Sequence, residues 1–287
     1  MGSDNATAAE LNKRQVRQAF ARAARDYDRH ARVQQEVGMR LLEHLDPIKL
    51  QPARILDAGA GTGTLARELA TRYGRALVVA LDIAEPMLQA ARVKAPRFFS
   101  RQRFVCADSE RLPLQRDRFD LVFSNLLLQW FTDPEPVFRE FVSVLAPGRP
   151  VLFSSLGPDT LRELRESWAA ADALVHVHAF LDMHDVGDAL VRTGFVDVVM
   201  ETERLTVQYP SVDILMRDLR GLGARNASAG RRRALTAPAR LDRMREAYER
   251  LRTDAGLPAT FEVVYGHAWK PEHSAFEVSI DALRQRP

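Results

Sequence analysis

The spacing of apolar residues changes twice along this chain of 287 residues. From about Leu11 to Leu45, apolar side chains recur at helical spacing and predict one long or two short amphipathic helices. The residues that set this period are Val16, Phe20, Ala23, Tyr27, Ala31 and Leu41. The first ten residues lack the period. We therefore expect residues 1–45 to form a tail followed by a helical cap.

Between residues 46 and 155, short apolar runs alternate with helical stretches. Strands are expected at Arg54–Asp57, Ala76–Asp82, Arg103–Ala107, Phe119–Ser124 and Pro150–Ser154. Helices are expected at Gly63–Tyr73, Pro86–Ala95 and Pro136–Leu145. Strands separated by helices indicate βαβ units and a parallel sheet with helices on both faces. This stretch is therefore predicted to be a doubly wound α/β core of Rossmann-like type.

Residues 156–287 are expected to complete this core and to carry a helical insertion at about 210–255, before the last strand. The predicted helices are Leu161–Ala173, Met183–Thr193 and an interrupted stretch from Val212 to Thr253. The predicted extended segments are Val196–Met200, Arg204–Tyr209 and Thr260–His267.

A glycine-rich turn follows the first predicted strand, with Asp57 ahead of Gly59, Gly61 and Gly63. Glycine lets a backbone turn sharply and lie against a ligand. A dinucleotide loop needs G-x-G-x-x-G, whereas Thr64 occupies the position of the third glycine here. The G-x-G-x-G spacing favours the methionine and ribose parts of S-adenosylmethionine, which has no pyrophosphate.

Two acids strengthen this interpretation. Asp82 ends the second strand, where its carboxylate is expected to accept the ribose hydroxyls, with Ile83 and Met87 flanking the adenine. Asp108, followed by Ser109, ends the third strand near the adenine amino group. Ligands of open α/β sheets bind at the carboxyl ends of the strands. Each acid taken alone could also be a helix N-cap, although this is the lesser explanation, and their joint spacing favours a cofactor site.

The end of the fourth strand supplies the candidates next to the reacting atoms. Asn125 is expected beside the sulfonium, and Gln129 and Trp130 follow where a methyl acceptor enters. Trp130 is equally well explained as an anchor in the hydrophobic core.

Composition excludes several other classes of protein. One cysteine, Cys106, leaves no internal disulfide. No apolar run approaches the length of a membrane span, and the N-terminus has no secretory signal, so we expect a cytoplasmic protein without a membrane partner. The net charge of +3 does not indicate nucleic acid. His176, His178 and His184 match no zinc spacing, so no metal site is predicted.

Several motifs resemble the malonyl-[acyl-carrier-protein] O-methyltransferases of biotin synthesis over nearly the full length. They are residues 20–28 (FARAARDYD), 59–63, 125–130 (NLLLQW), 156–164 (LGPDTLREL) and 216–226 (MRDLRGLGARN). Ala60 departs from the family, where cysteine is frequent. The resemblance implies a doubly wound, seven-stranded class I S-adenosylmethionine methyltransferase sheet, with the N-terminal helical cap and the helical insertion.

The resemblance also implies an activity and roles for particular residues. The activity is methyl transfer from S-adenosylmethionine to the free carboxylate of malonyl-acyl carrier protein, or of malonyl-coenzyme A. Tyr27 is expected to cover the methionine end of the cofactor and to act as the catalytic lid. Arg220 is expected to pair with the malonyl carboxylate, and Phe180 to shape the acceptor pocket. Tyr27 and Phe180 are also explained by core packing, and Arg220 by a solvated surface.

The stretch from Arg217 to Arg252 carries 11 arginines and 4 acids, a net charge of 11 − 4 = +7. Such a face favours encounter with an acidic carrier protein, although a solvated helix explains it too. Nucleic acid is not expected as a partner, since only one aromatic residue, Tyr248, lies in the stretch.

Three other functions stay open from the sequence. The first is methylation of a small free carboxylic acid. The second is hydroxylation of a protein arginine, because the surroundings of Tyr209-Pro210 and Gly223–Asn226 resemble a complex I assembly factor as well. The third is a cofactor-binding module without catalysis.

Overall fold

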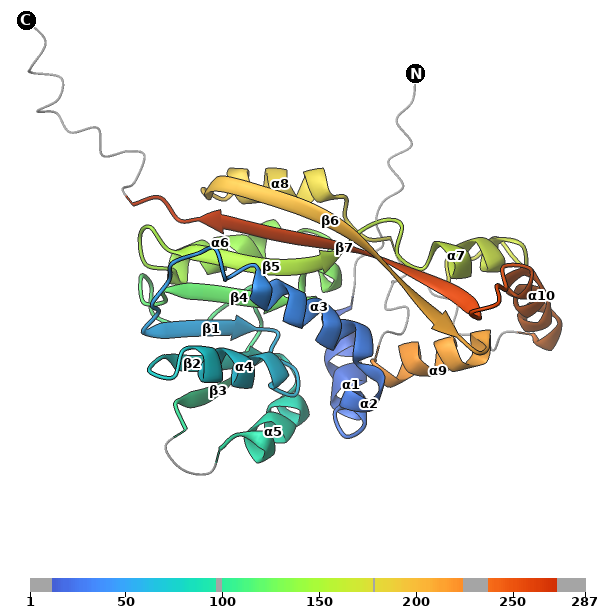
Figure 1. Ribbon diagram of the computed structural model, residues 1–287, viewed down its shortest axis with the longest axis horizontal. Helices are drawn as coiled ribbons and strands as arrows, with labels where there is room; N and C mark the ends of the chain where they lie inside the picture. The colour runs from blue at the N-terminus through green and yellow to red at the C-terminus, as the bar shows by residue number, and fades with distance from the viewer. Residues whose placement is uncertain (1–11, 97–99, 178, 224–236, 273–287) are drawn as a thin grey trace, which may run out of the picture.

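The computed structural model describes residues 12–96, 100–177, 179–223 and 237–272. Within these ranges one sheet has seven strands in the order β3-β2-β1-β4-β5-β7-β6 (Figure 1). The strands are β1 (Arg54–Ala58), β2 (Leu77–Asp82), β3 (Gln102–Cys106), β4 (Leu121–Asn125), β5 (Pro150–Leu156), β6 (Val196–Tyr209) and β7 (Leu257–Trp269). Strands β1 to β5 pair in parallel, and β7 runs antiparallel between β5 and β6. This confirms the predicted seven-stranded α/β fold.

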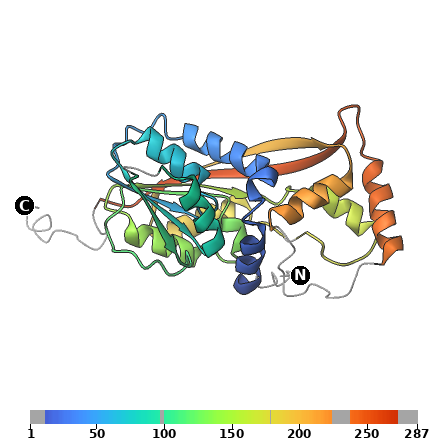
Figure 2. The same cartoon turned by 90° about the horizontal axis from the view of Figure 1, so that it is seen from below.

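Helices cover both faces of the sheet. They are α3 (Arg32–Glu43), α4 (Thr64–Arg72), α5 (Glu85–Lys94), α6 (Glu135–Val144) and α8 (Met183–Arg192). Figure 2 shows α3 and α4 on one side of the sheet and α6 on the other, where α8 packs beside α6.

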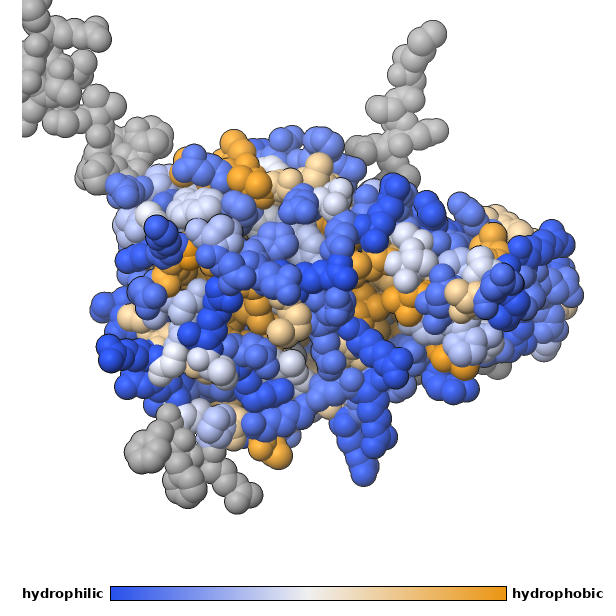
Figure 3. Space-filling model, viewed as in Figure 1, coloured by the Kyte–Doolittle hydropathy of each residue, from blue (hydrophilic) through white to orange (hydrophobic). Residues whose placement is uncertain are grey.

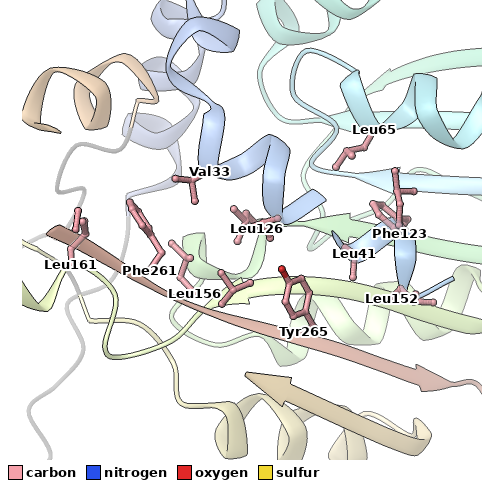
Figure 4. Close-up of a cluster of buried hydrophobic side chains, with 14 of the residues drawn as sticks. Val33, Leu41, Leu65, Phe123, Leu126, Leu152, Leu156, Leu161, Phe261 and Tyr265 are labelled. Atoms are coloured by element: carbon pink, nitrogen blue, oxygen red, sulfur yellow. The ribbon is translucent and has the colours of Figure 1, made fainter. Parts of the chain in front are cut away.

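Alternation along each strand divides the core between these two faces. In β4, Leu121 and Phe123 point to the α3 side, and Val122 points to the α6 side. The side chains on each face form a cluster of buried, mainly aliphatic and aromatic residues. Figure 4 shows part of the cluster on the α3 side of the sheet, between α3 and the strands β4, β5 and β7.

A lobe of helices stands beyond the sheet, at the far end of the long strands β6 and β7 (Figure 1). It consists of α7 (Arg162–Ala169), α9 (Val212–Gly221) and α10 (Pro238–Glu249). Helices α9 and α10 lie within the stretch predicted as a helical insertion, while residues 224–236 lie outside the described part of the chain.

The structure corrects two predicted elements. The cap has three helices, because α1 (Lys13–Ala23) and α2 (Tyr27–His30) precede α3. The two segments predicted between 196 and 209 form the single strand β6, since β7 supplies hydrogen-bond partners along almost its whole length. Among the described residues, no helix is long and apolar enough to cross a membrane.

Candidate active site

One large cavity opens where the chain order of the sheet reverses, between β1 and β4. Its volume is about 1780 Å³, including space open to solvent. It is lined by the first turn after β1, the ends of β2 and β4, the cap, and helices α7 and α9 of the lobe. His30 of α2 bonds Asp218 of α9 at 2.9 Å, so cap and lobe meet beside it. This is the position at which doubly wound sheets bind ligands.

The glycine turn forms the floor of the cavity. Gly59 and Gly61 line it with left-handed backbones, at φ +77° and +53°. A Cβ at Gly61 would meet no atom within 4 Å, so the bare backbone faces open space. Gly63 does not line the cavity; it precedes α4, and a Cβ there would lie 2.8 Å from the Cβ of Ala91. Gly63 therefore serves close helix packing, while Gly59 and Gly61 are placed to contact a ligand.

Asp82 stands at the end of β2 against this turn. Its Oδ2 accepts the Gly61 N–H at 2.9 Å, and its Oδ1 accepts the Ala84 N–H at 2.8 Å. Burial raises the pKa of Asp82, and these backbone N–H groups oppose that rise. Ile83 and Met87 line the same wall of the cavity. The carboxylate is thus fixed in one orientation at the place predicted for the ribose.

Asp108 and Ser109, which follow the edge strand β3, line the same cavity. Asp108 accepts a hydrogen bond from the Lys13 ammonium at 2.8 Å, and Lys13 also bonds Glu110. The first cap helix is therefore held over this part of the cavity by an ion pair. Because Lys13 takes one oxygen of Asp108, the expected bond to the adenine amino group stays a prediction.

In the described ranges, three buried acceptor atoms that have no hydrogen-bond partner belong to residues lining the cavity. They are Asp57 Oδ2, Gln34 Oε1 and Gln129 Oε1. Burial, and then the charge of Asp82, raise the pKa of Asp57 to about 7. Unpaired buried acceptors are costly, and an ammonium group bound in the cavity would offer N–H donors to such atoms. The methionine part of S-adenosylmethionine carries such a group, so these residues fit the cofactor.

Aromatic side chains of the cap close the cavity. Phe20 packs edge-on against Trp130, at 5.0 Å between ring centroids, and lies 6.3 Å from the ring of Tyr27. Burial, with the charges of Asp82 and Asp28, raises the pKa of the Tyr27 hydroxyl. Tyr27 is consequently neutral at physiological pH, which suits a lid rather than a base.

Asn125 links β4, β5 and the cap. Its amide donates to the Gln34 carbonyl at 2.9 Å and accepts from Ser154 Oγ at 2.7 Å. Asn125 lines the cavity, but this side chain is largely engaged in holding α3 on the sheet. The following residue, Leu126, has φ +52°, a strained conformation for a residue with a Cβ.

The lobe end of the cavity is mostly apolar. It is lined by Leu156, Thr160, Leu161, Leu164, His176, Val177, Phe180, Leu219, Leu222 and Phe261. The predicted Phe180 belongs to this wall. Arg220 does not: it is exposed on α9, whereas its neighbours Leu219 and Leu222 face the cavity.

The sequence analysis and the cavity agree on most residues. The cavity lining includes Tyr27, Asp57, Gly59, Gly61, Asp82, Ile83, Met87, Asp108, Ser109, Asn125, Gln129, Trp130 and Phe180, and leaves out Gly63 and Arg220. Gln34 as a cavity residue was missed, although a polar residue on the buried face of α3 is a usable signal. Within the described ranges, no three His, Cys, Asp or Glu side chains gather to hold a metal ion; His178 lies outside them.

The protein is similar to methyltransferases in sequence and in fold. A family model described as a methyltransferase domain matches residues 55–148. A putative methyltransferase from Bacillus halodurans superposes with a TM-score of 0.58 at 18% identity, covering 82% of this chain and 98% of that one. Phosphoethanolamine N-methyltransferase 2 of Haemonchus contortus, solved with S-adenosyl-L-methionine, has a TM-score of 0.53 at 21% identity, covering 82% and 52%. Fold and cavity together define an S-adenosylmethionine-dependent methyltransferase.

Sequence relatives narrow the class to one family. The malonyl-[acyl-carrier protein] O-methyltransferase of Gallionella capsiferriformans is 49% identical over 266 residues, 91% of this chain and 92% of the relative. The enzyme of the same name from Legionella pneumophila is 38% identical, covering 93% and 94%. The chain belongs to the malonyl-[acyl-carrier protein] O-methyltransferase family.

Proposed function

We propose that this protein transfers a methyl group from S-adenosylmethionine to the free carboxylate of a malonyl group carried by acyl carrier protein. The observation that carries the proposal is the 49% identity to a malonyl-[acyl-carrier protein] O-methyltransferase over 91% of the chain. The neutral ester would start the acyl chain from which biotin synthesis draws. Malonyl-coenzyme A is the alternative carrier of the same carboxylate.

The reaction asks little of the protein in proton transfer. A malonyl carboxylate has a pKa of roughly 4, so it is an anion at neutral pH and no base is required. Its oxygen attacks the methyl carbon, the carbon–sulfur bond breaks, and sulfur keeps the electron pair. The protein must align the two reactants and exclude water, because opposite charges attract each other more strongly in a dry site.

The cavity offers residues for each of these tasks. We assign Tyr27, backed by Phe20, to closing the methionine end. Gln129 and Trp130 also line the cavity. Phe180 belongs to its apolar wall beside the lobe, which we call the acceptor end. In this assignment Asn125 acts chiefly by fixing the cap on the sheet.

We assign docking of the carrier to the exposed face of α9. Two arginines of the stretch 217–252 are engaged in ion pairs, Arg245 with Asp213 and Asp242, and Arg252 with Glu249, so they are less available to a partner. Arg217 and Arg220 are exposed on α9, beside the mouth of the acceptor end. Arg231-Arg232-Arg233 lie outside the described residues. In this position Arg220 suits contact with an acidic carrier better than the predicted pairing inside the cavity.

Intact-protein mass spectrometry tests the function. Malonyl-acyl carrier protein, incubated with the enzyme and S-adenosylmethionine, is expected to gain one methyl that mild esterase treatment removes. Malonyl-coenzyme A and free malonate, run alongside, separate carrier, coenzyme and small-acid acceptors. Bound cofactor without any methylated product would contradict the proposal.

The other functions considered from the sequence are not favoured, because relatives at 38% to 49% identity share one name and span nine tenths of the chain. A cytoplasmic location, and the division into a cap, a core and an insertion-bearing remainder, stay predictions.

A further inference from the structure

The acceptor end of the cavity needs a partner for an anion. Among the described residues that line the cavity, the basic ones are Lys13 and His176. Lys13 is bonded to Asp108 and Glu110 at the other end of the cavity, beside the glycine turn and Asp82, which we call the nucleotide end. His176 instead stands in the apolar wall of the acceptor end, between α7 and Phe180.

The ring of His176 is held in one position. It stacks flat on Trp168, with 3.6 Å between ring centroids and 9° between planes. Its Nε2 lies 2.9 Å from Asp172 Oδ1, which also accepts the Leu174 N–H at 2.9 Å. Because Nε2 is engaged, Nδ1 is the nitrogen left to meet a ligand. A histidine fixed by a stack and a carboxylate is built for one orientation of its free nitrogen.

A carboxylate and an aromatic face both contact this ring. Asp172 supplies a negative charge in direct contact, and the face of Trp168 attracts a cation. The positive charge of Arg240 on α10 opposes these attractions; its Nη1 lies 3.7 Å from Asp172 Oδ2. Burial raises the pKa of Asp172, but the bonds from Leu174 and His176 and the charges of His176 and Arg240 lower it overall, so this carboxylate stays ionised.

We propose that the His176 imidazolium, oriented by Asp172 and Trp168, binds the carboxylate end of the malonyl group. The inference rests on the proposed function and names the group that recognises its substrate. Nδ1–H donates to one carboxylate oxygen, which leaves the other oxygen facing the methyl donor. Nearby apolar side chains strengthen the attraction by excluding water.

This pairing gives a reason for product release. The methyl ester is neutral, so the ion pair with His176 is lost as soon as the methyl group is transferred. An acetyl thioester, which has no carboxylate, would never form it. The site would therefore distinguish substrate from product and from the acetyl carrier by one charge.

Binding to an inert complex tests the proposal. Dissociation constants for malonyl- and acetyl-acyl carrier protein are measured with saturating S-adenosylhomocysteine, for the native protein and for His176→Gln. The native protein is expected to bind the malonyl form at least about tenfold more tightly, the size of a charge-assisted hydrogen bond. His176→Gln is expected to lose that ratio while its affinity for the acetyl form and for S-adenosylhomocysteine is unchanged. Retention of the ratio would overturn the proposal.

Two further variants keep the test decisive. His176→Phe preserves the stack on Trp168 and is expected to behave like His176→Gln, which covers a failure of the first variant to fold. Asp172→Asn is expected to weaken malonyl binding less, with KM raised and kcat nearly unchanged; a fall in kcat alone would count against a role in binding. Failure of the native protein to methylate malonyl carrier, with cofactor bound, would instead remove the proposed function itself.

Discussion

The two ends of the cavity are built in opposite ways. The nucleotide end consists of backbone turns and acids: Gly59 lines it, Gly61 exposes bare backbone, and Asp82 is fixed by two backbone N–H groups. The acceptor end is apolar along most of its wall, and in the described part of the chain His176 is its basic residue. Figure 3 shows apolar surface between the main body and the lobe of α7, α9 and α10.

This contrast reflects the charges of the two reactants. S-adenosylmethionine carries two positive charges and many polar groups, so its end needs acceptors in fixed positions. A malonyl thioester carries one negative charge on a thin arm, so its end needs one partner and a dry wall. Acids concentrated at one end and a single cation at the other would align opposite charges across the reacting atoms.

Removing the fixed acid should have the largest effect. Asp82→Ala is expected to weaken S-adenosylmethionine binding by about 100-fold, because it removes the ribose acceptor and loosens Gly61. Titration calorimetry measures this. Asp120→Ala is a matched control, since Asp120 also accepts two backbone N–H groups, of Ala53 and Arg54, at the opposite end of β1. Equal losses in both variants would contradict a specific role for Asp82.

Opening the lid between the two ends should come next. Tyr27→Ala is expected to lower kcat by about 10- to 100-fold, since a misaligned methyl group and entering water slow the transfer. Tyr27→Phe, which keeps the ring and its contact with Phe20, should stay within a few-fold of the native rate. Single-turnover rates separate the two variants. An equally slow Tyr27→Phe would move the role from the ring to the hydroxyl.

The buried acid of the nucleotide end should make stability depend on pH. The pKa of Asp57 is raised to about 7, so the folded protein keeps a proton that the unfolded chain loses near pH 4. This contribution to stability is complete below about pH 4 and is lost as pH rises through 7. Asp57→Asn removes it. Thermal unfolding should therefore show the native Tm falling relative to the variant between pH 5 and pH 8.

The same group should report the cofactor. An ammonium next to Asp57 favours the carboxylate, so binding of S-adenosylhomocysteine at pH 7 should release roughly half a proton. Calorimetry in buffers of different ionisation enthalpy measures that release, and Asp57→Asn should show none. Identical pH trends in the two proteins would place the titrating group elsewhere.

The smallest effect is expected outside the cavity. Arg220→Ala should raise KM for the malonyl carrier by about 2- to 5-fold at low salt and hardly at all at high salt, because exposed charges act mainly on encounter. Arg75→Ala, an exposed arginine in the turn between α4 and β2, is the control. A large, salt-independent loss would return Arg220 to the predicted role of carboxylate anchor.

The nucleotide end was predictable because its residues are local in sequence. Strand, turn and helix follow one another from Ile55 to Thr64, and the acids directly follow or end the next strands, so spacing alone brought them together. Even there, the engagement of Asn125 with Gln34 could not be foreseen, since it depends on how α3 docks.

The acceptor end was predictable only in part. Its wall joins segments around Leu161, Phe180, Leu219 and Phe261, which are far apart in the chain. Helical periodicity shows which side chains avoid water, but the same pattern describes a core and an apolar cavity. For that reason the sequence analysis chose Arg220, the conspicuous charge, and considered His176 only as a metal ligand, because its stack with Trp168 is not visible in the sequence.

A crystal structure with S-adenosylhomocysteine and a malonyl pantetheine analogue tests the two-ended cavity most directly. The account predicts the ribose on Asp82, the amino group within hydrogen-bond distance of Asp57, and the malonyl arm along the apolar wall with its carboxylate at His176. A malonyl group bound elsewhere, or an acceptor end left empty at saturating analogue, would contradict it.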